Sequence, residues 1–146
     1  MGAPPTLNLT VENRIEALTP AMDTVESYLT AWSVDGEDRA QVMIILDEIA
    51  SNIIKSAWPA GGTHEFRLEL HIEPGVPTLH LDILAIDDGV AFDPTSAPPP
   101  ALNLDLDDRE PGGLGLFLVG EMSESMRYHR EGGYNRLYIT KRLHRA

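Results

Sequence analysis

The chain has 146 residues, of which 42% are hydrophobic and 23% charged, as expected for one folded domain spanning residues 1–146. Its formal net charge of −12 argues against a protein that binds nucleic acid phosphates or an anionic membrane surface. The absence of cysteine excludes a disulfide framework and a cysteine zinc site. No apolar run approaches the roughly 20 residues of a membrane span, and the N-terminus lacks signal-peptide features, so we expect a cytoplasmic location.

The first part of the chain predicts one strand followed by two helices. Thr6–Val11 alternates apolar and polar residues and predicts an edge strand. Thr19–Trp32 predicts a helix, with Thr19 as its N-cap and Pro20 in its first turn. Asp38–Trp58 is the most strongly helical segment of the sequence.

The remainder is rich in strands. His64–Glu73 and Thr78–Ile86 predict two strands, Gly115–Met122 predicts a helix, and Met126–Arg130 with Arg136–Arg142 predicts a closing hairpin. This order of elements predicts an α/β two-layer sandwich with a largely antiparallel sheet. Residues 93–113, rich in proline and acids, exceed the usual loop length of about 12–15 residues and predict a mobile lid.

A polar stripe interrupts the apolar pattern of the long predicted helix. Glu48, Asn52 and Lys55 are spaced i, i+4 and i+7, which places them on one face. A solvated helix face is one interpretation. The other is a hard-cation site, because carboxylate and amide oxygens suit Mg²⁺, or a carboxylate base beside a bound nucleotide.

Two further segments each have a plain and a functional interpretation. Asp87-Asp88-Gly89 after a buried strand predicts either a turn or a carboxylate at the mouth of the core. Such a carboxylate would accept a hydrogen bond from an exocyclic amine such as adenine N6, and Gly89 would let a ligand approach the backbone. The glycines of residues 112–115 fit neither a Walker A loop nor a Rossmann fingerprint. They predict either a turn or free N–H groups at a helix start that bind an anion.

The three segments occur in one order: E-x-x-x-N on a helix, D-D-G-x-x-F-D-P after a strand, and G-G-L-G-L-F-L-V after a proline-rich stretch. This combination resembles the GHKL ATPase superfamily, which includes gyrase, MutL and the histidine kinases. The C-terminal stretch GLGLFLVGEMSESMRYHREGGYNRLYITKRL is similar to the small, RsbW-like anti-sigma-factor serine/threonine kinases. The resemblance covers nearly the whole chain. It implies a Bergerat ATP-binding fold, a mostly antiparallel mixed sheet with helices on one face.

The resemblance implies ATP and Mg²⁺ as cofactors and a role for individual residues. Asn52 would coordinate Mg²⁺, and Glu48 would be the general base that takes a proton from a substrate hydroxyl or a water. Asp87 would bond adenine N6, and Arg109 would reach the γ-phosphate from an ATP lid at residues 95–111. The implied ATP-binding residues are Asn52, Lys55, Asp87, Gly89, Arg109, Gly113, Leu114, Gly115 and Leu116. Ala91 departs from the broad pattern, which has a second glycine there.

The implied function is a serine/threonine protein kinase that phosphorylates a STAS-domain anti-anti-sigma antagonist. Partner switching would follow, with a sigma factor or another output protein as the second partner and a homodimer as a possible assembly. An alternative is a nucleotide-dependent binding module that sequesters a partner without kinase activity. The presence of both Glu48 and Asn52 favours catalysis. A histidine kinase catalytic domain or a DNA-repair or topoisomerase ATPase is a third interpretation, disfavoured because no dimerisation, phospho-acceptor or transducer domain is recognised.

Overall fold

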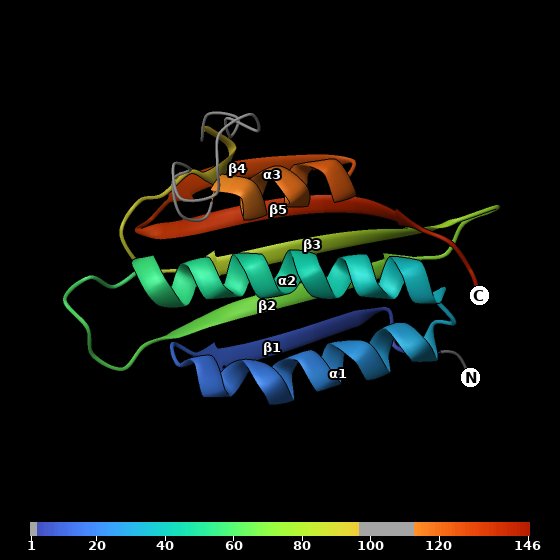
Figure 1. Cartoon of the computed structure of the whole chain (residues 1–146), viewed down its shortest axis with the longest axis horizontal. Helices are drawn as coiled ribbons and strands as arrows, with labels where there is room; N and C mark the ends of the chain where they lie inside the picture. Colours follow the sequence, from blue (N-terminus) through green and yellow to red (C-terminus); the bar gives the residue numbers. More distant parts are fainter. Residues whose placement is uncertain (1–2, 97–112) are drawn as a thin grey trace.

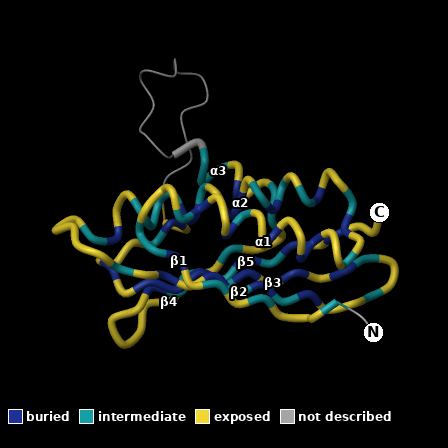
Figure 2. The backbone as a smooth tube through the Cα atoms, turned by 90° about the horizontal axis from the view of Figure 1, so that it is seen from below, coloured by how far each residue is buried: buried dark blue, intermediate teal, exposed yellow. Residues whose placement is uncertain are grey.

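The structure is a computed structural model that describes residues 3–96 and 113–146. Its five strands form one sheet in the order β1-β2-β3-β5-β4, and every neighbouring pair is antiparallel. Figure 1 shows the helices running roughly along the strands in front of this sheet, and Figure 2 shows them all on one of its faces. The strands are β1 Thr6–Glu12, β2 Glu65–Glu73, β3 Leu79–Asp87, β4 Ser125–Glu131 and β5 Tyr134–Leu143. The predicted two-layer sandwich with an antiparallel sheet is therefore confirmed, and β1 is an edge strand as expected.

The helices that cover the sheet are α1 (Leu18–Ala31), α2 (Gly36–Ser56) and α3 (Gly113–Met122). The prediction that Thr19 caps α1 is wrong, because the N-cap is Ala17 and no side chain bonds there. A single 3₁₀ turn, Ile15–Ala17, leads directly into α1, so backbone carbonyls take the place of a capping side chain. Among the described residues, none of these helices has the length and apolarity needed to cross a bilayer.

The N-terminus of α2 lies two residues earlier than the sequence pattern predicts. Asp35 is the N-cap, and its Oδ1 accepts a 2.8 Å hydrogen bond from the backbone N–H of Asp38. A carboxylate at this position satisfies a free N–H group and interacts favourably with the positive end of the helix dipole. The helix is thereby fixed at the end remote from Ser56, its last residue.

The core lies between α1, α2 and the sheet face that they cover. Every second residue of β2 is buried, while Arg67 and Glu65 on the opposite face are exposed. This alternation follows from the pleat, which turns successive side chains to opposite faces. The largest fully buried side chains include Leu29, Ile45, Leu46, Phe66, Leu68, Leu70, Ile72, Leu81, Ile83 and Ile139.

The hairpin β4–β5 turns within two residues. Gly132 and Gly133 have positive φ angles of 61° and 81°, the left-handed conformation that a tight hairpin turn requires at both central positions. Both strands are consequently longer than predicted. Their pairing brings Tyr128 opposite Leu137 and thereby sets one wall of the region described below.

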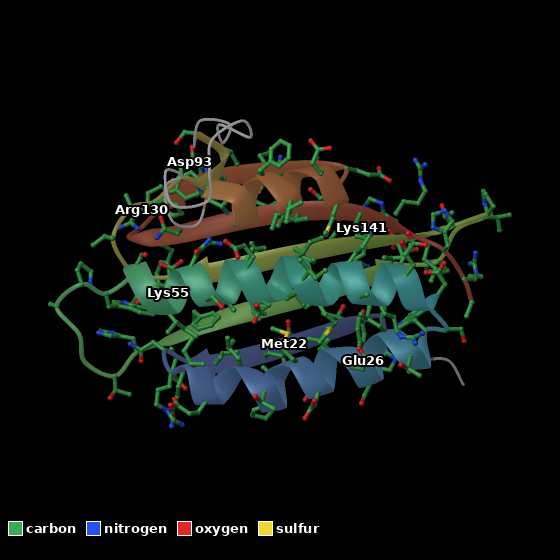
Figure 3. All side chains as sticks on the ribbon, in the orientation of Figure 1. Met22, Glu26, Lys55, Asp93, Arg130 and Lys141 are labelled. Atoms are coloured by element: carbon green, nitrogen blue, oxygen red, sulfur yellow. The ribbon has the colours of Figure 1, made fainter. Side chains whose placement is uncertain are left out.

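A buried lysine connects β5 to two helices. Lys141, labelled in Figure 3, is 5% exposed. Its Nζ donates hydrogen bonds to Gln41 Oε1 on α2 (2.6 Å) and to the backbone oxygen of Met122 (2.7 Å). A cation at the last carbonyls of a helix is favourable because it satisfies a free acceptor and opposes the helix dipole. Lys141 therefore fixes the C-terminal end of α3 against α2.

Lys141→Met keeps the apolar stem of the side chain but removes both hydrogen bonds. Because the Met122 carbonyl and the Gln41 amide oxygen lose their donor, we expect the free energy of unfolding to fall by about 1–3 kcal/mol in urea denaturation. Arg142→Met is the matched control, since the exposed Arg142–Glu124 ion pair (3.3 Å) contributes at most about 1 kcal/mol. An equal loss in both variants would contradict the connecting role of Lys141.

Candidate active site

A pocket opens where the C-terminal half of α2 meets the end of β3, the start of α3 and the β4–β5 hairpin. Apolar side chains make up most of its wall, among them Ile49, Ile53, Ala85, Leu116 and Leu137. The few polar side chains that reach it are those of Asn52, Ser56, Asp87, Tyr128 and Asn135. Apolar walls with a few polar groups are typical of sites that bind a small organic ligand.

Asp87 is the last residue of β3 and lies at the inner end of the pocket, only 7% exposed. Its Oδ1 accepts two hydrogen bonds of 2.9 Å, one from the backbone N–H of Gly89 and one from Asn135 Nδ2. Both bonds reach the same carboxylate oxygen. Oδ2 therefore retains its capacity to accept a hydrogen bond from a ligand.

The neighbouring acid, Asp88, has a different environment. It is exposed, and its Oδ1 accepts a 3.1 Å hydrogen bond from the indole N–H of Trp58, whose ring stacks on His64 at 4.7 Å. The turn pattern of Asp87-Asp88-Gly89 does not separate the two acids, and it was the family resemblance that pointed to Asp87. Asp87 is buried, bonded to Gly89 and Asn135, and lines the pocket, whereas Asp88 lies on the surface and is bonded to Trp58.

Gly89 is packed against the end of α2. A Cβ atom built on Gly89 would overlap with the carbonyl oxygen and Cβ of Ala57, and the next residue, Val90, donates a 2.8 Å hydrogen bond to that same oxygen. Glycine at this position thus allows a close approach of the protein's own backbone. The guanidinium of Arg130 donates a 2.8 Å hydrogen bond to the carbonyl oxygen of Gly89, which holds the loop from its other side.

The polar stripe of α2 lies beside this pocket. Asn52 Nδ2 donates a 3.3 Å hydrogen bond to Glu48 Oε1, and both side chains are half-buried. Because a carboxylate only accepts, the amide nitrogen faces Glu48 and the amide oxygen is left for a cation. Lys55 is exposed and does not line the pocket, although Figure 3 shows it at the same end of the molecule as Arg130.

The helix α3 begins at Gly113, two residues before the predicted start, so Gly115 lies in its first turn. The first N–H groups of a helix have no partner within the helix, so the donors of this turn need an acceptor from outside it. A side chain at Gly115 would overlap with the Glu48 carboxylate, and Leu116 contributes to the apolar wall. Glycine thus allows the start of α3 to approach Glu48.

Some predicted site residues lie outside the described part of the chain. Arg109 and most of the predicted lid at residues 95–111 fall within the undescribed range 97–112. Leu114 lies in the first turn of α3.

Asn135, Tyr128 and Arg130 were missed by sequence reasoning. Asn135 pairs with Asp87 in the β3–β5 register, 48 positions away in the chain, so no local motif connects them. One signal was present in the sequence. In the alternating pattern of β5, Asn135 and Lys141 are polar residues at inward positions, whereas the other inward residues, Leu137, Ile139 and Leu143, are apolar.

Comparison with known proteins gives consistent results. The family model of the histidine kinase-like ATPase domain matches residues 11–141. The serine/threonine-protein kinase BtrW of Bordetella bronchiseptica is 34% identical over 102 residues, which cover 70% of this chain and 69% of BtrW. The serine-protein kinase RsbW of Halalkalibacterium halodurans is 25% identical over 146 residues, which cover 97% of this chain and 86% of RsbW.

A solved structure shares the fold. The RsbU and RsbW domains of Rv1364c from Mycobacterium tuberculosis superpose with a TM-score of 0.70 at 15% identity. The match covers 98% of this chain and 34% of that one, so this chain corresponds to about a third of the solved protein. At this identity the likeness concerns the fold alone.

Gly89→Ala tests the packing of Gly89 against the end of α2. The added methyl group would overlap with Ala57, so we expect a loss of about 1–3 kcal/mol in the free energy of unfolding. Gly120→Ala is the matched control, because none of the described residues lies within 4 Å of a Cβ built there. Alanine also has a higher helix propensity than glycine, by up to about 1 kcal/mol. If Gly89→Ala were as stable as Gly120→Ala by urea denaturation, the close contact would be wrong.

Proposed function

Because the chain belongs to the histidine kinase-like ATPase family, and within it to the RsbW-like serine/threonine-protein kinases, we propose that it phosphorylates a STAS-domain anti-anti-sigma antagonist. The observation that carries this proposal is the Glu48–Asn52 pair beside the pocket that contains Asp87. Glu48 as general base, Asn52 as cation ligand and Asp87 as the group that recognises the adenine ring would then act at one site. Phosphoryl transfer needs chiefly this kind of positioning and charge stabilisation.

The adenine ring would occupy the apolar part of the pocket. Its N6 amine would donate to Asp87 Oδ2, since Oδ1 is already bonded by Gly89 and Asn135. The carboxylate also disfavours guanine, whose O6 presents an acceptor to an acceptor. The triphosphate would then extend along α2 toward the first turn of α3.

Asn52 would hold Mg²⁺ through its amide oxygen. The donor set fits, because Mg²⁺ in nucleotide sites usually takes one or two protein oxygens and completes its shell with phosphates and waters. The hydrogen bond from Asn52 Nδ2 to Glu48 keeps that oxygen directed away from the carboxylate. When bound, the ion would offset the negative charge of the phosphate oxygens.

Glu48 would act as the general base. Its Oε1 is bonded by Asn52, and Oε2 would accept the proton of a serine or threonine hydroxyl as that oxygen attacks the γ-phosphorus. The bond between the γ-phosphorus and its bridging oxygen breaks, and ADP leaves with the electron pair. Free N–H groups in the first turn of α3, from Gly113 onward, would stabilise charge on the phosphate oxygens.

The partners would be exchanged through phosphorylation. Unmodified antagonist would compete with a sigma factor or another output protein for this chain, and the phosphorylated antagonist would dissociate. A formal charge of −12 is compatible with a basic partner surface. We place this exchange in the cytoplasm, with a homodimer as the assembly to be tested by light scattering.

Glu48→Gln tests the base. We expect it to lower the rate of ³²P transfer from ATP to the cognate STAS protein by about 10²–10⁴-fold, while Mg-ATP affinity measured by calorimetry stays within about threefold. Asp47→Asn is the matched control, since it neutralises an exposed carboxylate of the same helix and leaves transfer unchanged. Transfer at the wild-type rate in Glu48→Gln would exclude this base. A wild-type protein that binds Mg-ATP but transfers nothing would favour the sequestering module instead.

Asn52→Ala tests the cation ligand. In the presence of Mg²⁺ we expect the affinity for ATP to fall by about tenfold or more. In EDTA the variant and the wild type should bind ATP equally weakly, because the lost ligand acts only on the ion. A similar loss of affinity in Mg²⁺ and in EDTA would show that Asn52 contacts the nucleotide itself or supports the fold.

A further inference from the structure

Asn135 lies at the centre of a closed hydrogen-bond network at the inner end of the pocket. Its Nδ2 donates to Asp87 Oδ1 (2.9 Å) and to the carbonyl oxygen of Val90 (2.8 Å). Its Oδ1 accepts from the hydroxyl of Tyr128 and from the backbone N–H of Phe92 (3.4 Å). The network thus joins β5 to the end of β3, to β4 and to the loop between β3 and α3.

This network permits one orientation of the Asn135 amide. The side chain offers two N–H groups and one oxygen with two lone pairs, and all four positions are occupied. A flipped amide would set its oxygen against the Asp87 and Val90 oxygens and its NH₂ group against the Phe92 N–H, so it would lose three of the four bonds. Only the Tyr128 hydroxyl, which can also accept, could keep a bond to it. Asn135 and Asp87 are 6% and 7% exposed, so water does not compensate for such a mismatch.

The fixed amide determines what residue 87 presents to the pocket. Two donors, Nδ2 of Asn135 and the N–H of Gly89, converge on the same atom of Asp87, so that atom must be an oxygen. In the native protein the second atom is also an oxygen and accepts. If residue 87 were an amide, its oxygen would stay on the inner side and its NH₂ group would face the pocket.

We propose that Asn135 is a specificity-determining positioning residue, which fixes the hydrogen-bond polarity of residue 87 and thereby the class of purine that the pocket accepts. With Asp87 the pocket takes a 6-aminopurine, and with asparagine at that position it takes a 6-oxopurine. The inference rests on the proposed nucleotide function of this pocket. It extends that function to β5, on which no predicted site residue lies.

The chemistry of the two purines makes the preference reversible. Adenine presents a 6-amino donor, whereas hypoxanthine presents a 6-oxo acceptor in a ring of nearly the same size. An acceptor facing Asp87 Oδ2 loses a hydrogen bond and leaves two like partial charges in contact. Inosine triphosphate is the suitable probe, because it lacks the 2-amino group by which guanosine triphosphate would add bulk.

The test compares the affinities of Mg-ATP and Mg-ITP by calorimetry in the wild type and in Asp87→Asn. We expect the wild type to prefer ATP by at least about tenfold, the usual result of exchanging one hydrogen bond for two facing acceptors. Asp87→Asn should prefer ITP by a similar factor. Asp87→Ala, which offers neither donor nor acceptor, should show no preference beyond about threefold. An Asp87→Asn variant that still prefers ATP, or that binds both equally, would overturn the proposal.

A double variant that exchanges the residues at positions 87 and 135 tests the role of Asn135 itself. In the double variant Asp87→Asn, Asn135→Asp, the side chain at position 135 becomes a charged acceptor. Its hydrogen bond from the NH₂ group of the new amide at position 87 is charge-assisted, and therefore stronger than the bond from the Gly89 N–H to the oxygen of that amide. The amide oxygen of residue 87 then faces the pocket, so the preference should return to ATP. Continued preference for ITP in the double variant would show that Asn135 has only a structural role.

A measurement on the wild type does not depend on the folding of any variant. The two side-chain N–H protons of Asn135 should exchange with solvent slowly by nuclear magnetic resonance, both with and without nucleotide, because both are bonded and buried. Rapid exchange would overturn the fixed orientation. A wild type that binds neither triphosphate would refute the proposed function, whereas normal ATP binding without a reversal in Asp87→Asn would refute this inference alone.

Discussion

The close approach of the end of α2 to the end of β3 is the constraint on which the site depends. The Val90 N–H bonds to the carbonyl oxygen of Ala57, and there is no space for a side chain at Gly89 between them. This contact fixes Asn52 on the helix and Asp87 on the strand on two sides of one pocket. A shift of α2 or β3 would move Asn52 away from Asp87, so that one nucleotide could no longer contact both residues.

The two sides differ in how they are held. The side of the sheet is rigid, because Asp87 and Asn135 belong to paired neighbouring strands and are bonded to one another in the interior. On the side of α2, one face packs on the sheet, and Glu48 and Asn52 lie half-buried at the edge of that face. Gly115 lets the first turn of α3 reach Glu48, and Lys141 holds the far end of α3 against α2. One helix thereby serves both the core and the site.

The sequence predicted every strand and the three helices α1, α2 and α3. For the alternating strands and for α2 the signal was periodicity, since burial on one face imposes a period of two or 3.6 residues. Motif spacing also indicated Asp87, Asn52 and Glu48. What it missed depends on tertiary contacts. The role of Asn135 follows from a strand register that connects distant segments, and the start of α1 follows from a 3₁₀ turn rather than from Thr19. Inward polar residues of β5 were the one local sign of such contacts.

A crystal structure of the chain with Mg²⁺ and a non-hydrolysable ATP analogue tests most directly whether these two sides form one nucleotide site. We predict the adenine N6 amine within hydrogen-bond distance of Asp87 Oδ2, and the metal ion on the amide oxygen of Asn52 between that residue and the phosphates. A nucleotide bound elsewhere, or a base that contacts neither Asp87 nor the apolar wall around Ile53, would contradict the site.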